Sequence, residues 1–293
     1  MTRETLKPQG RVFPTARRDA DAAAQTSLHP QTEHPAYRLA FQDMDFLLRE
    51  DLRPVRFQLE LLKPELLLEE AGIASTFVFY GSARIPSPEA APALLAAAKT
   101  PTQRAIAERL AAKSVYYEEA RRLAALAAAT PLDEEGRRHF TVCSGGGPSI
   151  MEAANRGAAE AGAPTIGLNI VLPHEQTPNR WVTPALSLNF HYFALRKMHF
   201  LLRARAVAVF PGGFGTFDET FELLTLIQTG KMAPLPILLF GESFWRRVID
   251  FDELAAEGVI SPNDISLFRF VETAEEAWAH VEAHYRDRPL AEK

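Results

Sequence analysis

The sequence is poor in the features that would mark a secreted or membrane protein. It contains a single cysteine, Cys143, so the chain cannot form an internal disulfide. Its first residues lack the apolar core of a secretory signal, and no stretch reaches ~18 uninterrupted apolar residues. We therefore expect a cytoplasmic protein without a membrane partner.

Neither acidic nor basic residues are in large excess. The formal net charge is −5 and no long lysine or arginine tract is present, so nucleic acid is not an expected partner. The composition, 47% apolar and 24% charged, is typical of a globular protein that buries a sizeable core.

Three signatures of common sites are missing. The first candidate strand ends in GSAR (81–84) instead of G-x-G-x-x-G, and no glycine loop ends in G-K-[ST]. These absences favour a small phosphate-bearing ligand over NAD binding or ATP hydrolysis. His191 and His199 have no partners at metal-ligand spacing, so no metal is expected. No other cofactor is expected either. Cys143 alternates with Val142 in a strand pattern and is expected in the core.

The chain divides into three stretches. Residues 1–36 mix proline, histidine, threonine and charges without periodicity, which predicts a flexible arm. Residues 37–72 carry apolar residues at helical spacing, broken near Pro54 and Pro64, and predict a helical extension. Residues 73–288 alternate between strand-like and helix-like segments and predict one α/β domain.

Seven short apolar runs in this domain are candidate strands: 75–81, 139–147, 164–172, 186–191, 206–213, 234–241 and 267–272. Most are separated by helical segments, which predicts a doubly wound parallel sheet with helices on both faces. In such a sheet a ligand binds at the carboxyl ends of the strands, near a switch in strand order.

Three small, polar or glycine-rich loops follow candidate strands. They supply Gly81, Ser82 and Arg84 from GSAR, Gly145, Gly146 and Gly147 from SGGGPS (144–149), and Gly212, Gly213, Gly215 and Thr216 from PGGFGT (211–216). A glycine turn before a helix lets backbone N–H groups approach a phosphate at the positive end of the helix dipole. Pro148 suits a first helical position, because its missing N–H is not needed there. A tight turn would explain one such loop, but two in one sheet favour a ligand site.

The segment PGGFGTFDE (211–219) has two interpretations. Thr216 followed by Glu219 has the spacing of a capping box, which would make both residues structural. The same spacing recurs at Thr273 and Glu276 without a glycine turn, so capping alone does not require glycines. The chemical interpretation is a phosphate site, and Asp218 and Glu219 are the only carboxylates in this segment.

Arg196 and Lys197 form a basic pair between aromatic and apolar neighbours, in YFALRKMHF. A helix with its basic residues in water would account for the pair. A partly buried guanidinium that binds a phosphate or a charged transition state would account for its apolar surroundings as well.

The motifs SGGGPSIMEAANRGA, YFALRK and PGGFGTFDE, in this order along the chain, closely resemble those of the LOG (Lonely Guy) family, whose members are also catalogued as possible lysine decarboxylases. The resemblance covers roughly residues 73–286. It implies a Rossmann-like homo-oligomer, a dimer or larger, that hydrolyses the N-glycosidic bond of nucleoside 5′-monophosphates to free base and ribose 5-phosphate. The substrate is expected to be AMP or a cytokinin riboside monophosphate.

The resemblance also assigns roles to residues. It implies that Arg196 and Glu219 are the catalytic pair and that the second glycine loop holds the phosphate. The pocket would be lined by Gly145, Gly146, Gly147, Glu152 and Asn155, with Lys197 and the GSAR loop as further substrate-binding candidates. The family usually has glycine where Ser149 stands, and a side chain there is expected to narrow the approach of the base.

Two other functions compete with hydrolysis. A decarboxylase that uses pyridoxal phosphate needs a Schiff-base lysine, for which Lys197 is the candidate near the motifs. A non-enzymatic nucleotide or cofactor carrier or sensor could use the same fold, but such a protein would not need both Arg196 and Glu219.

Overall fold

The chain forms two compact units, residues 1–59 and 60–293, in a computed structural model that describes residues 13–173 and 177–286. Described elements that begin in the first unit are α1 (Ala16–Ala23), α2 (Pro30–Glu33), α3 (Met44–Leu47) and α4 (Arg53–Glu70), with 3₁₀ turns at Pro35–Tyr37, Ala40–Gln42 and Glu50–Leu52. Two short helices therefore fall within the stretch expected to be an arm. Residues 1–12 of that arm, and 287–288 of the expected α/β domain, lie outside the described residues.

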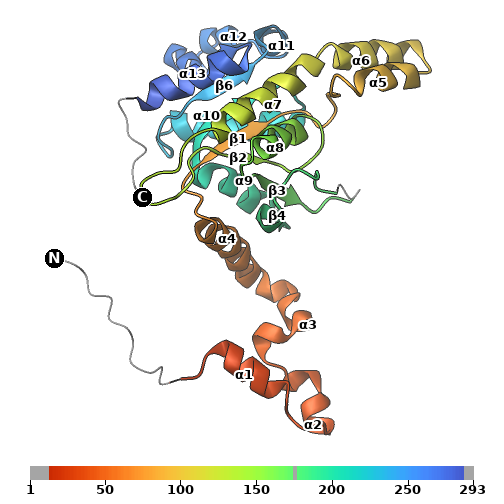
Figure 1. The fold of residues 1–293 in the computed structure, drawn as a ribbon, viewed down its shortest axis with the longest axis vertical. Coiled ribbons are helices and arrows are strands. Elements are labelled where there is room, and N and C mark those ends of the chain that lie inside the picture. Colours follow the sequence, from red (N-terminus) through yellow and green to blue (C-terminus); the bar gives the residue numbers. More distant parts are fainter. Residues whose placement is uncertain (1–12, 174–176, 287–293) are drawn as a thin grey trace, which may run out of the picture. The chain divides into compact units, whose positions relative to one another are not determined.

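The second unit begins at Glu60, within α4, and continues as an alternation of strands and helices (Figure 1). Its strands are β1 (Thr76–Tyr80), β2 (Thr141–Ser144), β3 (Ile166–Ile170), β4 (Ser187–Phe190), β5 (Ala204–Val209), β6 (Ile237–Phe240) and β7 (Arg269–Val271). Its further helices are α5 (Ala91–Ala97), α6 (Pro101–Ala111), α7 (Ser114–Ala128), α8 (Ile150–Glu160), α9 (Phe193–Leu202), α10 (Phe214–Gln228), α11 (Glu242–Val248), α12 (Phe251–Ala256) and α13 (Ala274–Tyr285), with 3₁₀ turns at Pro184–Leu186 and Pro262–Leu267. Each of the seven predicted strands is confirmed.

The strands form one parallel sheet in the order β4-β3-β2-β1-β5-β6-β7. The chain builds outward from β1 to β4, then returns to pair β5 with the other side of β1. The strand order therefore switches between β1 and β5, the position at which doubly wound sheets bind ligands. The predicted α/β class and parallel sheet are confirmed.

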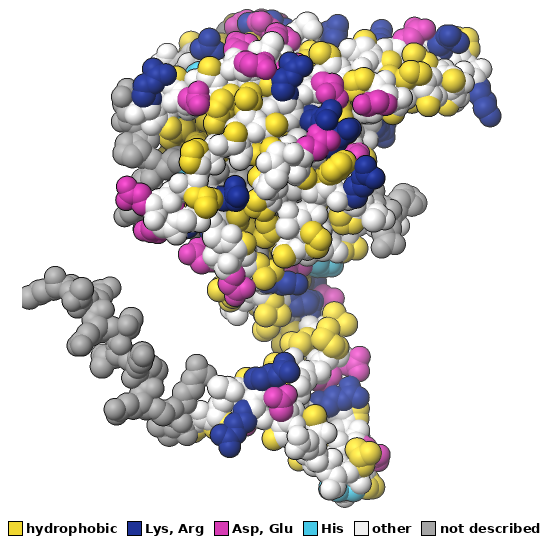
Figure 2. All heavy atoms as spheres, viewed as in Figure 1, with side chains coloured by type: hydrophobic (Ala, Val, Ile, Leu, Met, Phe, Trp, Pro, Cys, Tyr) yellow, Lys and Arg dark blue, Asp and Glu magenta, His cyan; other side chains and the backbone are white. Residues whose placement is uncertain are grey.

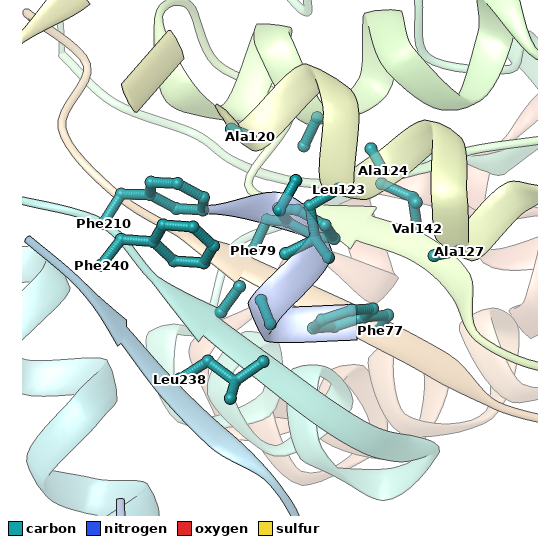
Figure 3. Packing of buried hydrophobic residues seen from close by; sticks show 14 of the residues in the cluster. Phe77, Phe79, Ala120, Leu123, Ala124, Ala127, Val142, Phe210, Leu238 and Phe240 are labelled. Atoms are coloured by element: carbon teal, nitrogen blue, oxygen red, sulfur yellow. The ribbon is translucent and has the colours of Figure 1, made fainter. Parts of the chain in front are cut away.

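Helices cover both faces of this sheet, so its central strands are buried on both sides. One face of β1 presents Phe77 and Phe79 to α7, α8 and α13 (Figure 3). In the same cluster the rings of Phe210 and Phe240 stack with their centroids 4.2 Å apart. The opposite face presents Tyr80, whose ring meets the edge of a phenylalanine of α9. Burial on both faces explains why TFVFY is a continuous apolar run.

The face of the molecule shown in Figure 2 is consistent with the mild net charge of the sequence. On the face shown in Figure 2, basic and acidic side chains are interspersed and do not form a large field of one sign. Among the described residues, no helix combines the length and the apolar character needed to cross a bilayer.

Candidate functional site

The three predicted loops lie side by side at the carboxyl edge of the sheet. They follow β1, β2 and β5, which are neighbouring strands at the switch in strand order. Ser82 connects the loops, because its N–H donates to the Pro211 carbonyl at 3.1 Å and its own carbonyl accepts the N–H of Ile150 at 3.3 Å. The backbone of Ser82 thus joins the second glycine loop to the start of α8, the helix that follows the first.

Two glycines at this edge make room for neighbouring side chains. A Cβ on Gly81 would lie 2.6 Å from Cγ2 of Ile150, so α8 can pack close to the end of β1 only if that position is glycine. A Cβ on Gly145 would lie 2.6 Å from Nη2 of Arg196. The first glycine loop therefore leaves space for the guanidinium that the sequence analysis singled out.

Arg196 lies on α9 and is held in a partly buried position. Its Nε donates to the carbonyl of Leu168 at 2.8 Å, and its guanidinium carbon is 5.1 Å from the centre of the Phe200 ring. The side chain is 12% exposed, so the basic residue does not simply face water. The terminal nitrogens remain directed toward the glycine loop and toward Glu219.

Glu219 lies on α10 with its carboxylate facing Arg196. Oε1 of Glu219 is 3.8 Å from Nη1 of Arg196, and the Glu219 side chain is 14% exposed. Burial raises the pKa of Glu219 to about 7, although Arg196 opposes that shift. The carboxyl group therefore exchanges its proton near neutral pH, as a group that works as an acid or base requires.

Tyr80 is a site residue that the sequence analysis did not single out. It ends β1 beneath these groups and is 3% exposed. Burial, together with the nearby Glu219 carboxylate, raises the pKa of Tyr80 well above its usual value, so the phenol keeps its proton. The available signal was its place, as the polar-tipped aromatic residue just before the GSAR loop.

The capping interpretation of Thr216 and Glu219 is wrong. Helix α10 begins at Phe214 with Gly213 as its N-cap, and no side chain caps it. Thr216 therefore lies inside the first turn, and Glu219 lies one turn further along. The same spacing does form a cap at the other position: Thr273 precedes α13, and its hydroxyl accepts the N–H of Glu276 at 3.2 Å.

The glycines of the second loop have different surroundings. A Cβ on Gly212 would collide with the side chain of Thr216. Gly213 and Gly215 would meet nothing within 4 Å, and neither has a positive φ. Neither packing nor backbone conformation requires glycine at these two positions. At Gly215, which lies inside the helix, glycine costs about 1 kcal/mol relative to alanine. An external ligand that approaches the backbone would account for them.

Asn155 supports the first glycine loop from inside the protein. It is 0% exposed, its Oδ1 accepts hydrogen bonds from Ser144 at 2.7 Å and Asn179 at 2.9 Å, and its Nδ2 donates toward Thr165. The side chain expected to line the pocket is thus engaged within the fold.

Asn179 fixes the same loop from a separate segment, and the sequence analysis did not identify it. Its Nδ2 lies 3.1 Å from the Gly146 carbonyl and 3.0 Å from the Gly147 carbonyl. Gly146 has φ +70, and a Cβ there would collide with Oδ1 of Asn169. No local pattern around Asn179 signals these contacts, because they depend on how distant segments pack.

Ser149 occupies a backbone conformation that favours glycine. Its φ is +68 and ψ −125, and it is the N-cap of α8, which begins at Ile150. The predicted start of this helix at Pro148 is therefore wrong. The Ser149 hydroxyl is buried and donates to the carbonyl of Ile85 at 2.5 Å.

Lys197 faces carboxylates of α10. Its Nζ is 3.1 Å from Oδ1 of Asp218 and 2.9 Å from Oε2 of Glu222. Burial lowers its pKa, but the hydrogen bonds to Glu222 and Asp218 outweigh this effect and raise the pKa overall. A Schiff-base lysine must lose its proton, and these contacts oppose that loss.

The other predicted residues lie around this centre. Arg84 is exposed on the GSAR loop, where its N–H donates to the Ser82 hydroxyl at 3.0 Å, and Glu152 is half-buried in the first turn of α8. Cys143 is buried, as predicted, and burial raises the pKa of its thiol. Within the described residues, no cluster of three or more His, Cys, Asp or Glu side chains could hold a metal ion.

Comparisons with known proteins find a similarity to the family that the motifs resemble. Residues 151–281 match the family model described as "Possible lysine decarboxylase". A cytokinin riboside 5′-monophosphate phosphoribohydrolase of Arabidopsis thaliana is 25% identical over 146 residues, covering 49% of this chain and 66% of that protein. A probable enzyme of the same name from Oryza sativa subsp. japonica is 30% identical over 96 residues, covering 32% of this chain and 46% of that protein. The matched segments thus span less than two thirds of either relative.

The solved structures that match the chain share little sequence with it and have low TM-scores. The Moco carrier protein of Chlamydomonas reinhardtii is 16% identical with a TM-score of 0.39, and the match covers 73% of this chain and 99% of that one. A protein solved as a structural genomics target is 21% identical with a TM-score of 0.41, covering 71% and 99%.

Proposed function

From its resemblance to the LOG family, we propose that this protein hydrolyses the N-glycosidic bond of nucleoside 5′-monophosphates. The motifs predicted this resemblance, and the family model and the curated relatives confirm it. The observation that carries the proposal is a buried carboxylate, Glu219, which faces Arg196 at 3.8 Å beside the glycine-rich start of α10. AMP is the first substrate to consider, with cytokinin riboside monophosphates as the class named for the relatives.

The phosphate would bind at the amino end of α10. Gly213 and Gly215 leave the backbone open to a ligand, and the N–H groups of the first helical turn have no partners within the helix. These donors and the helix dipole favour an anion. The Arg196 guanidinium, whose terminal nitrogens are close to the first glycine loop, would neutralise the phosphate and orient the ribose.

The reaction itself would be carried out at the carboxyl group of Glu219. The bond between C1′ and the base nitrogen breaks, a water oxygen forms the new bond to C1′, and the proton that the water loses balances the proton that the leaving base gains. The sugar passes through an oxocarbenium-like state, which an adjacent carboxylate stabilises while it also accepts a proton from the water. A pKa of about 7 leaves a large fraction of Glu219 ionised at neutral pH and able to act as that base.

A panel assay tests this proposal. We expect AMP to release adenine, measured by chromatography, without added metal or cofactor. We expect adenosine to react far more slowly, because each charge-assisted hydrogen bond to the phosphate contributes roughly 1.5–3 kcal/mol. Binding of monophosphates without base release would favour a carrier. Carbon dioxide from lysine in the presence of pyridoxal phosphate would favour a decarboxylase, which the ion-paired state of Lys197 disfavours.

We also propose that the protein is a homo-oligomer. Large apolar side chains are exposed on two neighbouring helices, Phe193 and Met198 on α9 and Phe214 and Phe221 on α10, with Phe214 96% exposed. The contacts of Lys197 with α10 hold the two helices together. Exposed apolar groups of this kind are typical of protein interfaces, and a second copy is the expected partner. Light scattering that finds a monomer at micromolar concentration would contradict this proposal.

A further inference from the structure

Helix α9, which carries Arg196, is held at its amino end by a residue of α4. The N–H of His191 donates to Oε1 of Glu60 at 2.8 Å, and the N–H of Tyr192 donates to Oε2 of the same carboxylate at 3.1 Å. Tyr192 is the N-cap of α9 and offers no side-chain cap of its own. Glu60 therefore supplies the missing cap from 131 residues earlier in the chain, with a negative charge at the positive end of the helix.

The same residue also contacts α9 on the other side of Arg196. Nε2 of His199 donates to the backbone carbonyl of Glu60 at 3.1 Å. His199 is 4% exposed, and burial lowers its pKa, so the ring is held neutral with its proton on Nε2. One residue of α4 thus fixes the helix before and after Arg196.

The position of Arg196 depends on small distances. Its Nε bonds to the Leu168 carbonyl at 2.8 Å, its Nη1 is 3.8 Å from Glu219, and its Nη2 fits where Gly145 has no Cβ. A slide or rotation of α9 would change all three distances together. Displacements of about 1 Å in a reactive arrangement cost about 100-fold in rate.

We propose that Glu60 is a positioning residue for Arg196, acting through the orientation of α9. The inference rests on the proposed function, because it takes Arg196 as a group that contacts the substrate. It adds a residue that lies outside the range matched by the family model, residues 151–281, and assigns a role in the site to the helical extension.

The test compares two variants at this position with a control on the same helix. Glu60→Ala removes both acceptors and is expected to lower kcat/KM for AMP by about 10–100-fold. Glu60→Gln keeps one side-chain oxygen and nearly the same size, so its loss is expected to be smaller. Glu70→Ala removes the same charge from an exposed position of α4 and is expected to leave kcat/KM within about twofold of wild type.

A double-mutant cycle separates positioning from general support of the fold. In an Arg196→Lys background, Glu60→Ala is expected to change kcat/KM by no more than about threefold, because residues that act as a unit are not additive. Equal losses in both backgrounds would overturn the proposal. If the wild-type protein releases no base from any monophosphate, the proposed function fails, and amide hydrogen exchange still decides the role of Glu60. Glu60→Ala should speed exchange across 191–199 and leave 150–160 unchanged, and unchanged exchange at 191–199 would overturn the inference.

Discussion

Two segments of this protein share a threonine followed three residues later by a glutamate, and the structure uses them in different ways. Thr273 precedes its helix and caps it, and Glu276 stays exposed. Thr216 lies inside α10, and Glu219 is buried against Arg196. The difference arises because the glycine turn lets α10 begin at Phe214, which moves both residues one turn into the helix. Spacing alone therefore does not identify a cap; the residue at which the helix begins does.

The strongest test of this comparison is Glu219→Gln. Glutamine keeps the shape of the side chain but cannot carry the charge or accept the proton, so we expect kcat for AMP to fall by roughly 10²–10⁴-fold. Glu276→Gln, the matched change at the capping segment, is expected to leave kcat unaltered. Steady-state kinetics and a thermal melt of both variants provide the measurement. Turnover of Glu219→Gln within a few-fold of wild type would remove Glu219 from the mechanism.

The same variant should change how stability depends on pH. The folded-state pKa of Glu219, about 7, lies above its usual 4.5. Its contribution to stability is therefore fully present below pH 4.5 and is lost as the pH rises through 7. Glutamine avoids that loss, so Glu219→Gln is expected to exceed wild type in free energy of unfolding by up to about 3 kcal/mol at pH 8, and by little at pH 4. Urea unfolding at both pH values measures the difference; a gain that does not vary with pH would contradict it.

Gly215→Ala tests whether the second glycine loop binds the phosphate of the substrate. A Cβ at this helical position meets nothing within 4 Å, and alanine is a better helix former, so the melting temperature should stay the same or rise. We expect the KM for AMP to increase by about 10-fold, because at least one charge-assisted bond to the phosphate is disturbed. Adenosine is the internal control, since its KM does not depend on phosphate contacts. Equal changes for both substrates would place the phosphate elsewhere.

Thr273→Ala has the smallest expected effect. It removes the hydroxyl that accepts the Glu276 N–H, which should cost about 0.5–2 kcal/mol of stability. Turnover should remain at the wild-type level, because α13 supplies no residue to the site. Denaturant unfolding measures the change in stability, and the adenine-release assay measures turnover. A loss of turnover under conditions where the variant is fully folded would show that Thr273 influences the site.

The sequence predicts the architecture well because the relevant signals are local. Each strand is a short apolar run bounded by a turn, and strands that alternate with helices can pair in parallel only through crossover connections. The loops at the strand ends follow directly from this arrangement. The pairing of Arg196 with Glu219 came from the family resemblance, and the structure brings these two side chains together.

Features that depend on tertiary packing were not predicted. The start of α10 at Phe214 and that of α8 at Ile150 depend on where backbone donors find partners. The contacts of Asn179 and Glu60 join segments far apart in sequence, and a single polar residue in a loop or on a helix carries no pattern that identifies its partner. The raised pKa of Glu219 likewise results from burial, and the sequence motif does not predict how deeply that side chain is buried.

The backbone of Ser149 also determines which residues that position can tolerate. Its conformation, with φ +68, costs a residue with a side chain about 1–3 kcal/mol, and glycine would avoid the cost. The Ser149 hydroxyl offsets part of this cost by donating to the Ile85 carbonyl, a bond that connects the segment after GSAR to the start of α8. Serine and glycine at this position should therefore give similar stability, glycine by avoiding the strain and serine by forming the hydrogen bond. Alanine would keep the strain and lose the bond. Serine can replace the glycine that the family usually has here because its hydroxyl bonds to the Ile85 carbonyl, a bond that most other side chains could not form.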